Sequence, residues 1–340
     1  MKFTIVGAGA IGGTVGAYMA RGGEEVVFVD QDVAHVKAMK EKGLTIKGYQ
    51  ETFTLPVTAN YLEELAGPLD VVLLAVKAQH TEEAVRSIQH LVGPDTAILS
   101  LQNGLCEQTI AKLVGAERTL GAFVNFSADY LEPGLIHYGS TGALYVGELD
   151  GRISPRIATI ARALSHWGTV HKTDNIWGYL WGKLGYANML FATALVDATM
   201  ADVTDRYHEL MAELACEIYE AADKEGVRVE GFDAIAPSIY YPREQQDWAR
   251  VHASLDQMAA WQRSSQKTKS GIWRDLAVRK RRTEVDQQIG LAVVAGGRHG
   301  LPMPLTRRVV AMIHTLEDGS REMSWANLDE LESMRRGTKR

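Results

Sequence analysis

The sequence of 340 residues contains two cysteines, Cys106 and Cys216, no surplus of basic residues and no long apolar run. Two distant cysteines without a C-x-x-C pattern argue against a disulfide framework and a metal site, and they fit a reducing cytoplasm. The formal net charge of −6 argues against nucleic-acid binding. The apolar stretch over 184–196 is too short to cross a bilayer, and a strand pattern begins where an export signal would lie. We therefore expect a cytoplasmic protein that binds neither nucleic acid nor membrane.

The most informative feature that is present is the G-x-G-x-x-G spacing of residues 7–12. A strand pattern precedes it and a helix pattern follows it, which is the context of dinucleotide binding, whereas glycine clusters elsewhere more often mark ordinary turns. In such a turn Gly7 permits the tight bend, Gly9 lets the backbone approach a pyrophosphate, and Gly12 lets the helix pack closely on the strand. The predicted cofactor contacts in this turn are Gly7, Gly9, Ala10, Ile11 and Gly12.

An acidic residue, Asp30, ends the second predicted strand at residues 25–29. A carboxylate at this place accepts hydrogen bonds from the adenosine ribose hydroxyls and favours NAD over NADP. Asp32 lies two positions further on, so a 2′-phosphate would meet two negative charges. The alternative is an aspartate that only caps the end of a strand. We predict NAD as the cofactor, with NADP disfavoured.

The first half of the sequence alternates between strand and helix patterns. Unbroken apolar runs at 69–76 and 97–101 are typical of strands that are buried on both faces of a mostly parallel sheet. Further predicted elements are strands at 118–126 and 142–148, turns at 133–134 and Gly139, a hairpin over 43–57, and helices over 31–41, 82–91 and 154–164.

From residue 174 onward strand signals nearly vanish and long helical patterns take over. The predicted elements here are helices over 176–196, 206–224, 276–298 and 306–316, with short helices and loops over 232–265. The length also suits two domains. We therefore predict an α/β fold: a Rossmann-type domain with a mostly parallel sheet over 1–171, and an all-helical domain for substrate binding and dimerisation over 172–340.

Four polar residues are candidates for chemistry. Lys77 and Asn103 each follow one of the two apolar runs, and the carboxyl ends of parallel strands face the ligand crevice, although polar groups there are commonly only loop residues. Lys183 lies in an apolar stretch, where burial would lower its pKa toward catalytic usefulness, unless the side chain reaches solvent along a half-buried helix. Glu284 lies in a charged segment, for which an exposed helix face is the alternative.

Together with the glycine turn at 7–12, these candidates define five segments, of which the other four are Lys77, L-Q-N-G at 101–104, W-G-K-L at 181–184 and R-T-E-V-D at 282–286. In order and spacing these segments resemble the ketopantoate reductase family over nearly the whole chain. The resemblance implies a nicotinamide-dependent oxidoreductase that reduces 2-dehydropantoate to pantoate or interconverts another 2-keto and 2-hydroxy acid. It further implies that Lys183 donates the proton to the ketone oxygen and Glu284 holds a substrate hydroxyl. Asn103 and Lys77 would border the nicotinamide and the lysine.

The sequence also departs from the family. In the family, asparagines usually follow the lysine by one and two helical turns, but here these positions are Ala187 and Phe191. The nearby Asn188 is rotated by about 100° away from the helix face of Lys183. Residues 267–275 replace the serine-rich stretch of the family, and Ser270 is the one equivalent serine there. Asp30 replaces the basic residue that favours NADP. The pocket is therefore altered. The substrate-binding residues that the resemblance gives are Lys183, Asn188, Ser270 and Glu284.

Two alternatives stay open. An NAD-dependent catabolic dehydrogenase of a different branched or polyhydroxylated acid would keep Lys183 and Glu284 in a reshaped pocket. A non-catalytic NAD(H)-binding regulator would need neither residue.

Trp248, Trp261 and Trp273 either line the pocket or pack against other side chains. We expect a small keto or hydroxy acid as the partner and, from the long apolar helices, a homodimer.

Overall fold

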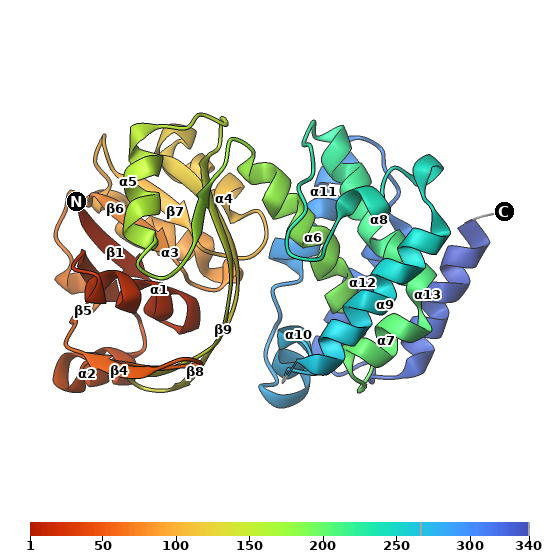
Figure 1. Ribbon diagram of the computed structural model, residues 1–340, viewed down its shortest axis with the longest axis horizontal. Coiled ribbons are helices and arrows are strands. Elements are labelled where there is room, and N and C mark those ends of the chain that lie inside the picture. Colours follow the sequence, from red (N-terminus) through yellow and green to blue (C-terminus); the bar gives the residue numbers. More distant parts are fainter. Residues whose placement is uncertain (266, 339–340) are drawn as a thin grey trace. The chain divides into compact units, whose positions relative to one another are not determined.

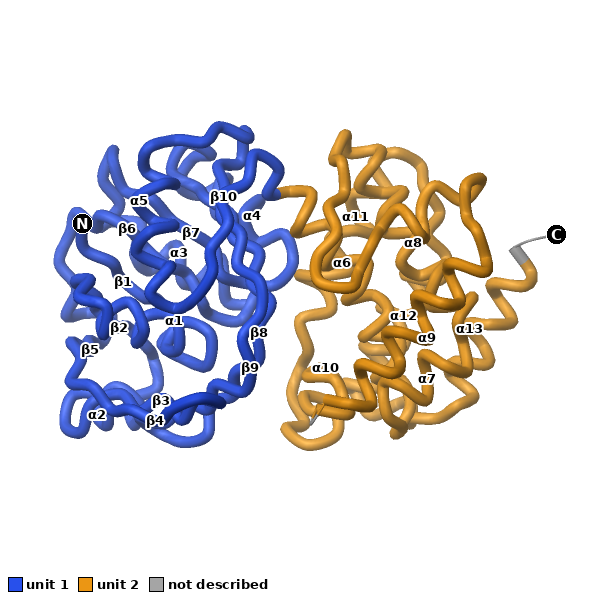
Figure 2. The backbone as a smooth tube through the Cα atoms, viewed as in Figure 1, with its two compact units in different colours: residues 1–176 blue, residues 177–340 orange. Residues whose placement is uncertain are grey.

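The computed structural model describes residues 1–265 and 267–338 (Figure 1). The chain divides into two compact units, Met1–Ile176 (unit 1) and Trp177–Arg340 (unit 2) (Figure 2). The division expected after residue 171 falls inside a short strand, Val170–Lys172, which pairs with another strand of unit 1. This pairing keeps residues 170–172 in unit 1, which extends to Ile176.

Unit 1 is built on one sheet, to which the described residues contribute ten strands. These are β1 (Lys2–Val6), β2 (Glu25–Val29), β3 (Leu44–Gly48), β4 (Thr52–Leu55), β5 (Thr58–Asn60), β6 (Val71–Leu74), β7 (Ala97–Ser100), β8 (Thr119–Glu132), β9 (Leu135–Glu148) and β10 (Val170–Lys172). Their order is β4-β3-β9-β8-β7-β6-β1-β2-β5, with β10 beside β9. The pairs β3–β4 and β8–β9 are antiparallel, whereas β2, β1, β6, β7 and β8 form a parallel series. The predicted mostly parallel sheet is confirmed.

Helices cover both faces of this sheet. They are α1 (Ala10–Arg21), α2 (Val33–Lys42), α3 (Thr81–Ile88), α4 (Cys106–Val114) and α5 (Pro155–Leu164). In β6, Val71 and Leu73 pack in the same core as α1 and α5, whereas Val72 and Leu74 pack with α3 and α4. This alternation confirms that the apolar run is a strand buried on both faces.

The longest strands, β8 and β9, form a bent hairpin that runs beyond the parallel series (Figure 1). Their turn lies at Pro133 and Gly134, as predicted, and Gly134 has a φ of +78° that favours glycine. The turn predicted at Gly139 is wrong. Gly139 lies inside β9, where its neighbour Tyr138 pairs with both Ala128 of β8 and Gly48 of β3. Pairing on both sides holds this stretch extended.

Unit 2 is helical apart from an isolated bridge between Phe232 and Ile235. Its helices are α6 (Ile176–Thr193), α7 (Met200–Arg206), α8 (His208–Lys224), α9 (Trp248–Ser264), α10 (Gly271–Trp273), α11 (Leu291–Arg298), α12 (Pro304–Glu317) and α13 (Trp325–Thr338). Helix α8 is central, since α9, α11, α12 and α13 all pack on it. The predicted helical second half is thus confirmed. Within the described residues, no helix has the length and apolarity to cross a membrane.

Two predictions in unit 2 are wrong in detail. The segment 232–265 contains the long helix α9, which Asp247 caps by accepting the N–H of Ala249 at 3.0 Å. The single helix predicted over 276–298 is instead interrupted between two π-helical turns, Arg274–Val278 and Asp286–Gly290. Asp275 causes this break in part, because its side chain and carbonyl bind Arg279 and Arg281. Helix α13 was not predicted.

Candidate active site

The glycine turn joins β1 to α1 and leaves room for a ligand at one glycine only. A Cβ on Gly7 would lie 2.7 Å from the Val76 nitrogen, and one on Gly12 would lie 2.2 Å from the Gly7 carbonyl oxygen. A Cβ on Gly9 would meet nothing within 4 Å. No side chain caps α1 at Gly9, so the N–H groups of its first turn can bind an anion. The turn therefore fits the pyrophosphate of a dinucleotide.

Two aspartates follow β2. Asp30 Oδ1 accepts the N–H of Asp32 at 3.0 Å, which orients the Asp30 carboxylate. Asp32 caps α2 by accepting the N–H groups of Ala34 and His35 at 3.0 and 3.1 Å. Burial alone would raise the pKa of Asp32, but these bonds and one from the Tyr130 hydroxyl lower it overall. This end of β2 therefore carries a charged Asp32 beside Asp30.

The structure places Lys77 and Asn103 at the same edge of the sheet as the glycine turn. They follow β6 and β7, and β7, β6 and β1 are parallel neighbours. Lys77 is exposed and Asn103 is half-buried. Gln102 joins their loops, since its Nε2 donates to the Val76 carbonyl at 2.9 Å and to the Thr81 hydroxyl at 2.8 Å. Unit 1 thus gathers all its predicted site residues except Asp30 on three adjacent strand ends, and Asp30 follows the next strand, β2.

Lys183 lies on α6 in unit 2, among apolar neighbours. Its sequence neighbours Trp181, Leu184 and Ala187 are buried, and Lys183 itself is half-buried. Burial lowers the pKa of Lys183 to about 8, and the charge of Glu284 opposes this by raising it. The structure thus brings Lys183 and Glu284 into electrostatic contact. A lysine in this state is charged at neutral pH and can release a proton readily.

Glu284 is 8% exposed and precedes a π-helical turn. Its carbonyl accepts the N–H of Gln288 at 3.0 Å. The preceding residue, Thr283, donates both its N–H and its hydroxyl to Glu317 Oε1 of α12, each at 2.7 Å. Glu317 therefore fixes the backbone that presents Glu284. The alternative of an exposed helix face therefore does not apply to Glu284.

Sequence reasoning missed two side chains that bind the backbone or the neighbours of candidate site residues, Glu317 and His35. Glu317 is 33 positions from Glu284 in sequence, so no local pattern connects the two. His35 is 1% exposed on α2 and binds the Ala8 carbonyl of the glycine turn at 2.9 Å. The sequence signal for His35 is a histidine beside Val36, on the buried side of a predicted helix.

Two other predicted substrate contacts have structural roles. Asn188 is fully buried, and its Nδ2 donates to the Leu214 carbonyl and the Thr306 hydroxyl, both at 2.8 Å. The rotation of Asn188 away from the face of Lys183 accounts for this placement, and we do not retain it as a substrate contact. Ser270 is buried, and its Oγ accepts the Trp273 N–H at 3.1 Å, which caps α10.

The three tryptophans differ in their surroundings. Trp261 is 61% exposed on α9. Trp248 lies edge-on to His252, with ring centroids 6.1 Å apart. Trp273 lies beneath Lys269, whose Nζ is 3.9 Å from the ring centroid. A cation over an aromatic ring is a stabilising packing contact.

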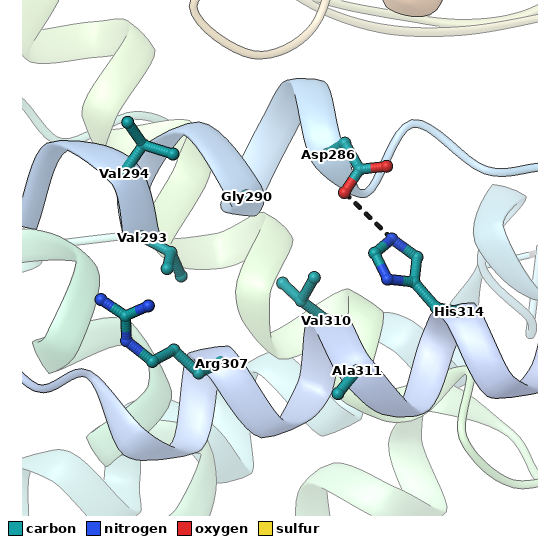
Figure 3. A pocket seen from close by; sticks show the side chains of 8 residues that line it. All are labelled: Asp286, Gly290, Val293, Val294, Arg307, Val310, Ala311 and His314. Atoms are coloured by element: carbon teal, nitrogen blue, oxygen red, sulfur yellow. Dashed lines mark hydrogen bonds and ion pairs between the residues drawn. The ribbon is translucent and has the colours of Figure 1, made fainter. Parts of the chain in front are cut away.

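A groove of about 390 Å³ lies between α11 and α12 (Figure 3). The Asp286 carboxylate and His314 Nε2, 2.9 Å apart, flank it on one side, and Arg307 lies farther along α12. Its lining is Asp286, Gly290, Val293, Val294, Arg307, Val310, Ala311 and His314. None of the predicted site residues lines this groove.

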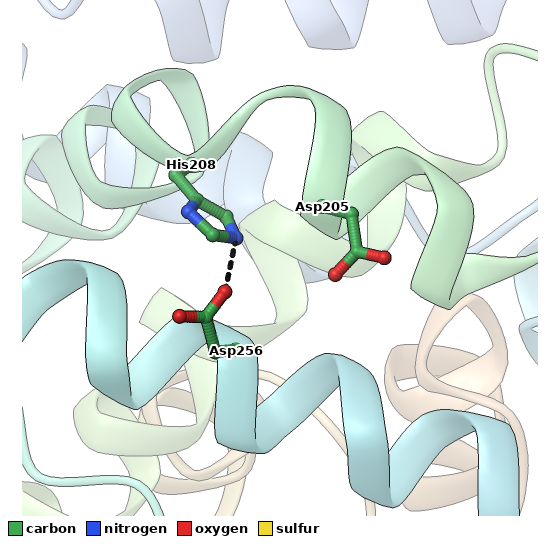
Figure 4. A group of neighbouring side chains, drawn as sticks. All are labelled: Asp205, His208 and Asp256. Atoms are coloured by element: carbon green, nitrogen blue, oxygen red, sulfur yellow. Dashed lines mark ion pairs between the residues drawn. The ribbon is translucent and has the colours of Figure 1, made fainter.

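Within the described residues, one group has the composition of a metal site (Figure 4). It consists of Asp205, His208 and Asp256, with ligand atoms that lie within 4.8 Å of one another. His208 Nε2 and Asp256 Oδ1 are 3.5 Å apart, and Asp205 already forms an ion pair with Arg263. Both aspartates are exposed. We assign no metal to this group.

Comparisons with known proteins give the family and the fold. Residues 3–151 match the family "Ketopantoate reductase PanE/ApbA", and residues 175–317 match its C-terminal family. A 2-dehydropantoate 2-reductase of Archaeoglobus fulgidus is 28% identical over 321 residues, 94% of this chain and 98% of the relative. The structure of a Geobacter metallireducens 2-dehydropantoate 2-reductase superposes with a TM-score of 0.78 at 26% identity, over 94% of this chain and 100% of that chain. D-mandelate dehydrogenase, solved with NADH and anilino(oxo)acetate, shares the fold with a TM-score of 0.79 at 24% identity, over 94% of this chain and 99% of that chain.

The chain belongs to the ketopantoate reductase family, because the two family matches together span most of it. It is a nicotinamide-dependent oxidoreductase of that family. The resemblance found in the sequence is thereby confirmed, together with its α/β and helical parts.

Proposed function

We propose that this protein reduces a 2-keto acid to the 2-hydroxy acid with NADH as the preferred cofactor, and that Lys183 is the proton donor. The observation that carries the proposal is the half-buried Lys183, whose pKa is lowered to about 8 by burial while Glu284 partly restores it. An ammonium of this kind is charged at neutral pH, yet it is a much stronger acid than an ordinary lysine.

A bound nicotinamide supplies the hydride that reaches the carbonyl carbon of the substrate. Negative charge then grows on the carbonyl oxygen, and the Lys183 ammonium stabilises that charge and donates its proton to the oxygen. Proton transfer from a positioned group contributes typically 10²- to 10⁴-fold to the rate. Glu284 keeps Lys183 protonated and can accept a hydrogen bond from a substrate hydroxyl.

Cofactor preference follows from the end of β2. Asp30, oriented by the Asp32 N–H, can accept hydrogen bonds from the ribose hydroxyls of NADH. The 2′-phosphate of NADPH would instead meet the Asp30 and Asp32 carboxylates. Gly9 and the first turn of α1 would hold the pyrophosphate, and Lys77 and Asn103 would border the nicotinamide.

The first candidate substrate is 2-dehydropantoate, on which the curated relatives named above act. A second candidate is a less polar 2-keto acid, for which the protein would act as an NAD-dependent dehydrogenase. The observation that favours it is the apolar character of Ala187 and Phe191, which are 8% and 0% exposed where the family has asparagines. The Ser270 hydroxyl, which accepts the Trp273 N–H, could still donate its own proton to a substrate oxygen in either case. Initial rates with 2-dehydropantoate and a panel of branched and aromatic 2-keto acids distinguish the two.

The test of the proposed chemistry is the variant Lys183→Ala. We expect the turnover of the keto acid to fall by at least about 10²-fold, while the dissociation constant of NADH, measured by fluorescence titration, stays within about twofold. Lys224→Ala, which removes an exposed lysine of α8, is the matched control and should change neither quantity. If Lys183→Ala retains turnover, Lys183 is not the proton donor.

The same experiment addresses the non-catalytic alternative. A wild-type protein that binds NADH but turns over none of the keto acids would be a regulator and not an enzyme. Homodimer formation also belongs to this proposal, and the solution mass from light scattering tests it.

A further inference from the structure

His35 is a buried side chain that is hydrogen bonded at both ring nitrogens. It is 1% exposed. The Gly134 N–H, at the turn between β8 and β9, donates to Nδ1 at 2.9 Å, so Nδ1 carries no hydrogen. Nε2 must then carry the ring hydrogen, and it donates to the Ala8 carbonyl at 2.9 Å. The ring is therefore neutral, with its tautomer fixed by two backbone groups.

Neighbouring side chains hold the ring in place. Asp32 accepts the His35 N–H at 3.1 Å and thereby begins α2 at this point. The Tyr130 hydroxyl donates to Asp32 Oδ2 at 3.1 Å. The Tyr130 ring also lies edge-on to the imidazole, with centroids 5.0 Å apart. Helix α2 and the β8–β9 hairpin thus both fix the position of His35.

The acceptor of this histidine belongs to the glycine turn. Ala8 lies between Gly7 and Gly9 and is fully buried. A Cβ on Gly13 would lie 2.6 Å from the Ala8 carbonyl oxygen, so the absence of that Cβ makes room for the carbonyl. In a trans peptide the C=O and the following N–H point in opposite directions. A carbonyl directed to His35 therefore directs the Gly9 N–H away from His35.

We propose that His35 is a positioning residue for the dinucleotide: it holds the Ala8–Gly9 peptide so that the Gly9 N–H faces the cofactor phosphates. The proposal rests on the proposed function in that its ligand is the nicotinamide cofactor. A preset N–H donor binds an anion without first reorienting the backbone, which favours affinity for every ligand that carries the pyrophosphate.

Two substitutions separate the two hydrogen bonds of the ring. His35→Gln places an amide nitrogen near the position of Nε2 and keeps a donor for Ala8. His35→Asn places an amide oxygen near the position of Nδ1, keeps an acceptor for Gly134 and loses the donor. His90→Asn is the matched control, because it makes the same change at an exposed histidine of unit 1 and leaves both ring bonds of His35.

The readout is the dissociation constants of NADH, ADP-ribose and adenosine, with kcat at saturating NADH. We expect His35→Asn to weaken NADH and ADP-ribose about tenfold or more, as for the loss of one hydrogen bond to a charged group. Adenosine, which carries no phosphate, should bind as to the wild type, and kcat should not change. His35→Gln and His90→Asn should stay within about threefold for each ligand.

Equal affinity of His35→Asn and the wild type for ADP-ribose would overturn the proposal. So would a loss of adenosine binding equal to that of ADP-ribose, since this indicates a purely structural role. ¹⁵N NMR of the wild type gives a test that needs no substitution: an Nδ1–H tautomer at His35, with or without ADP-ribose, is incompatible with the proposal. A wild type that binds none of these ligands would instead refute the proposed function.

Discussion

The pH dependence of Glu284→Gln tests the proton donor most closely. In the wild type the pKa of Lys183 lies at about 8, with burial lowering it and Glu284 raising it. Reduction requires the ammonium, so kcat should fall as the pH rises through about 8, and oxidation of the hydroxy acid should rise through the same range. Removing the carboxylate charge leaves only the lowering effect. An opposite charge near a group typically shifts its pKa by about 1 unit or more, so the midpoint should move to about 7 or below.

The magnitude follows from the protonated fraction. At pH 8 this fraction falls from about one half in the wild type to about one tenth in the variant, a loss of about fivefold beyond any loss at low pH. The assay is kcat for NADH oxidation from pH 5.5 to 9.5, compared with Glu322→Gln, which removes an exposed carboxylate. A midpoint that stays in place or moves upward refutes the assignment of Lys183 as the donor.

Three further predictions concern unit 1. Asp30→Ala should raise kcat/KM with NADPH relative to NADH by about tenfold, because a negative charge near the 2′-phosphate is lost; steady-state rates with both cofactors measure it, and an unchanged ratio contradicts it. Gly9→Ala should weaken NADH binding at an unchanged melting temperature, since its Cβ meets only open space, whereas Gly12→Ala should destabilise the fold by about 1–3 kcal/mol through its clash with the Gly7 carbonyl; the reverse ranking in thermal melts would count against this geometry. Burial raises the pKa of Glu107 to about 8 from 4.5. Its contribution to the free energy of unfolding is therefore present below pH 4.5 and is lost by up to about 1.4 kcal/mol per pH unit as the pH rises toward 8. Urea melts of Glu107→Gln at several pH values should lack this loss, and an equal pH slope in both proteins would contradict the prediction.

Local patterns predicted the fold where one physical cause dominates. The apolar run at residues 71–74 became β6 because helices bury both of its faces. Helix α9 was not predicted, although Val251, Leu255 and Met258 recur at helical spacing, because prolines and charges interrupt the pattern over 232–265. The interruption before Asp286 depends on the pairing of Asp275 with arginines, which a periodicity of apolar residues does not register.

The candidate site shows the same difference between features set by the local sequence and features that depend on distant residues. The glycine turn after β1 and the place of Asp30 at the end of β2 were predictable, because both follow from the local sequence. The depressed pKa of Lys183 was predicted from its apolar surroundings, and its direction is as expected. Asn188 was not predictable as a core residue, because its partners Leu214 and Thr306 are distant in sequence. His35 was missed for the same reason, since its contacts lie 27 and 99 positions away.

The most direct test of the central claim is the initial rate of NADH and NADPH oxidation by the wild type with 2-dehydropantoate and a panel of 2-keto acids. We predict turnover of at least one of these acids at about 1 to 10³ per second, faster with NADH than with NADPH at equal subsaturating concentrations. NADH binding without turnover of any 2-keto acid would contradict the account, and a preference for NADPH would contradict the role given to Asp30.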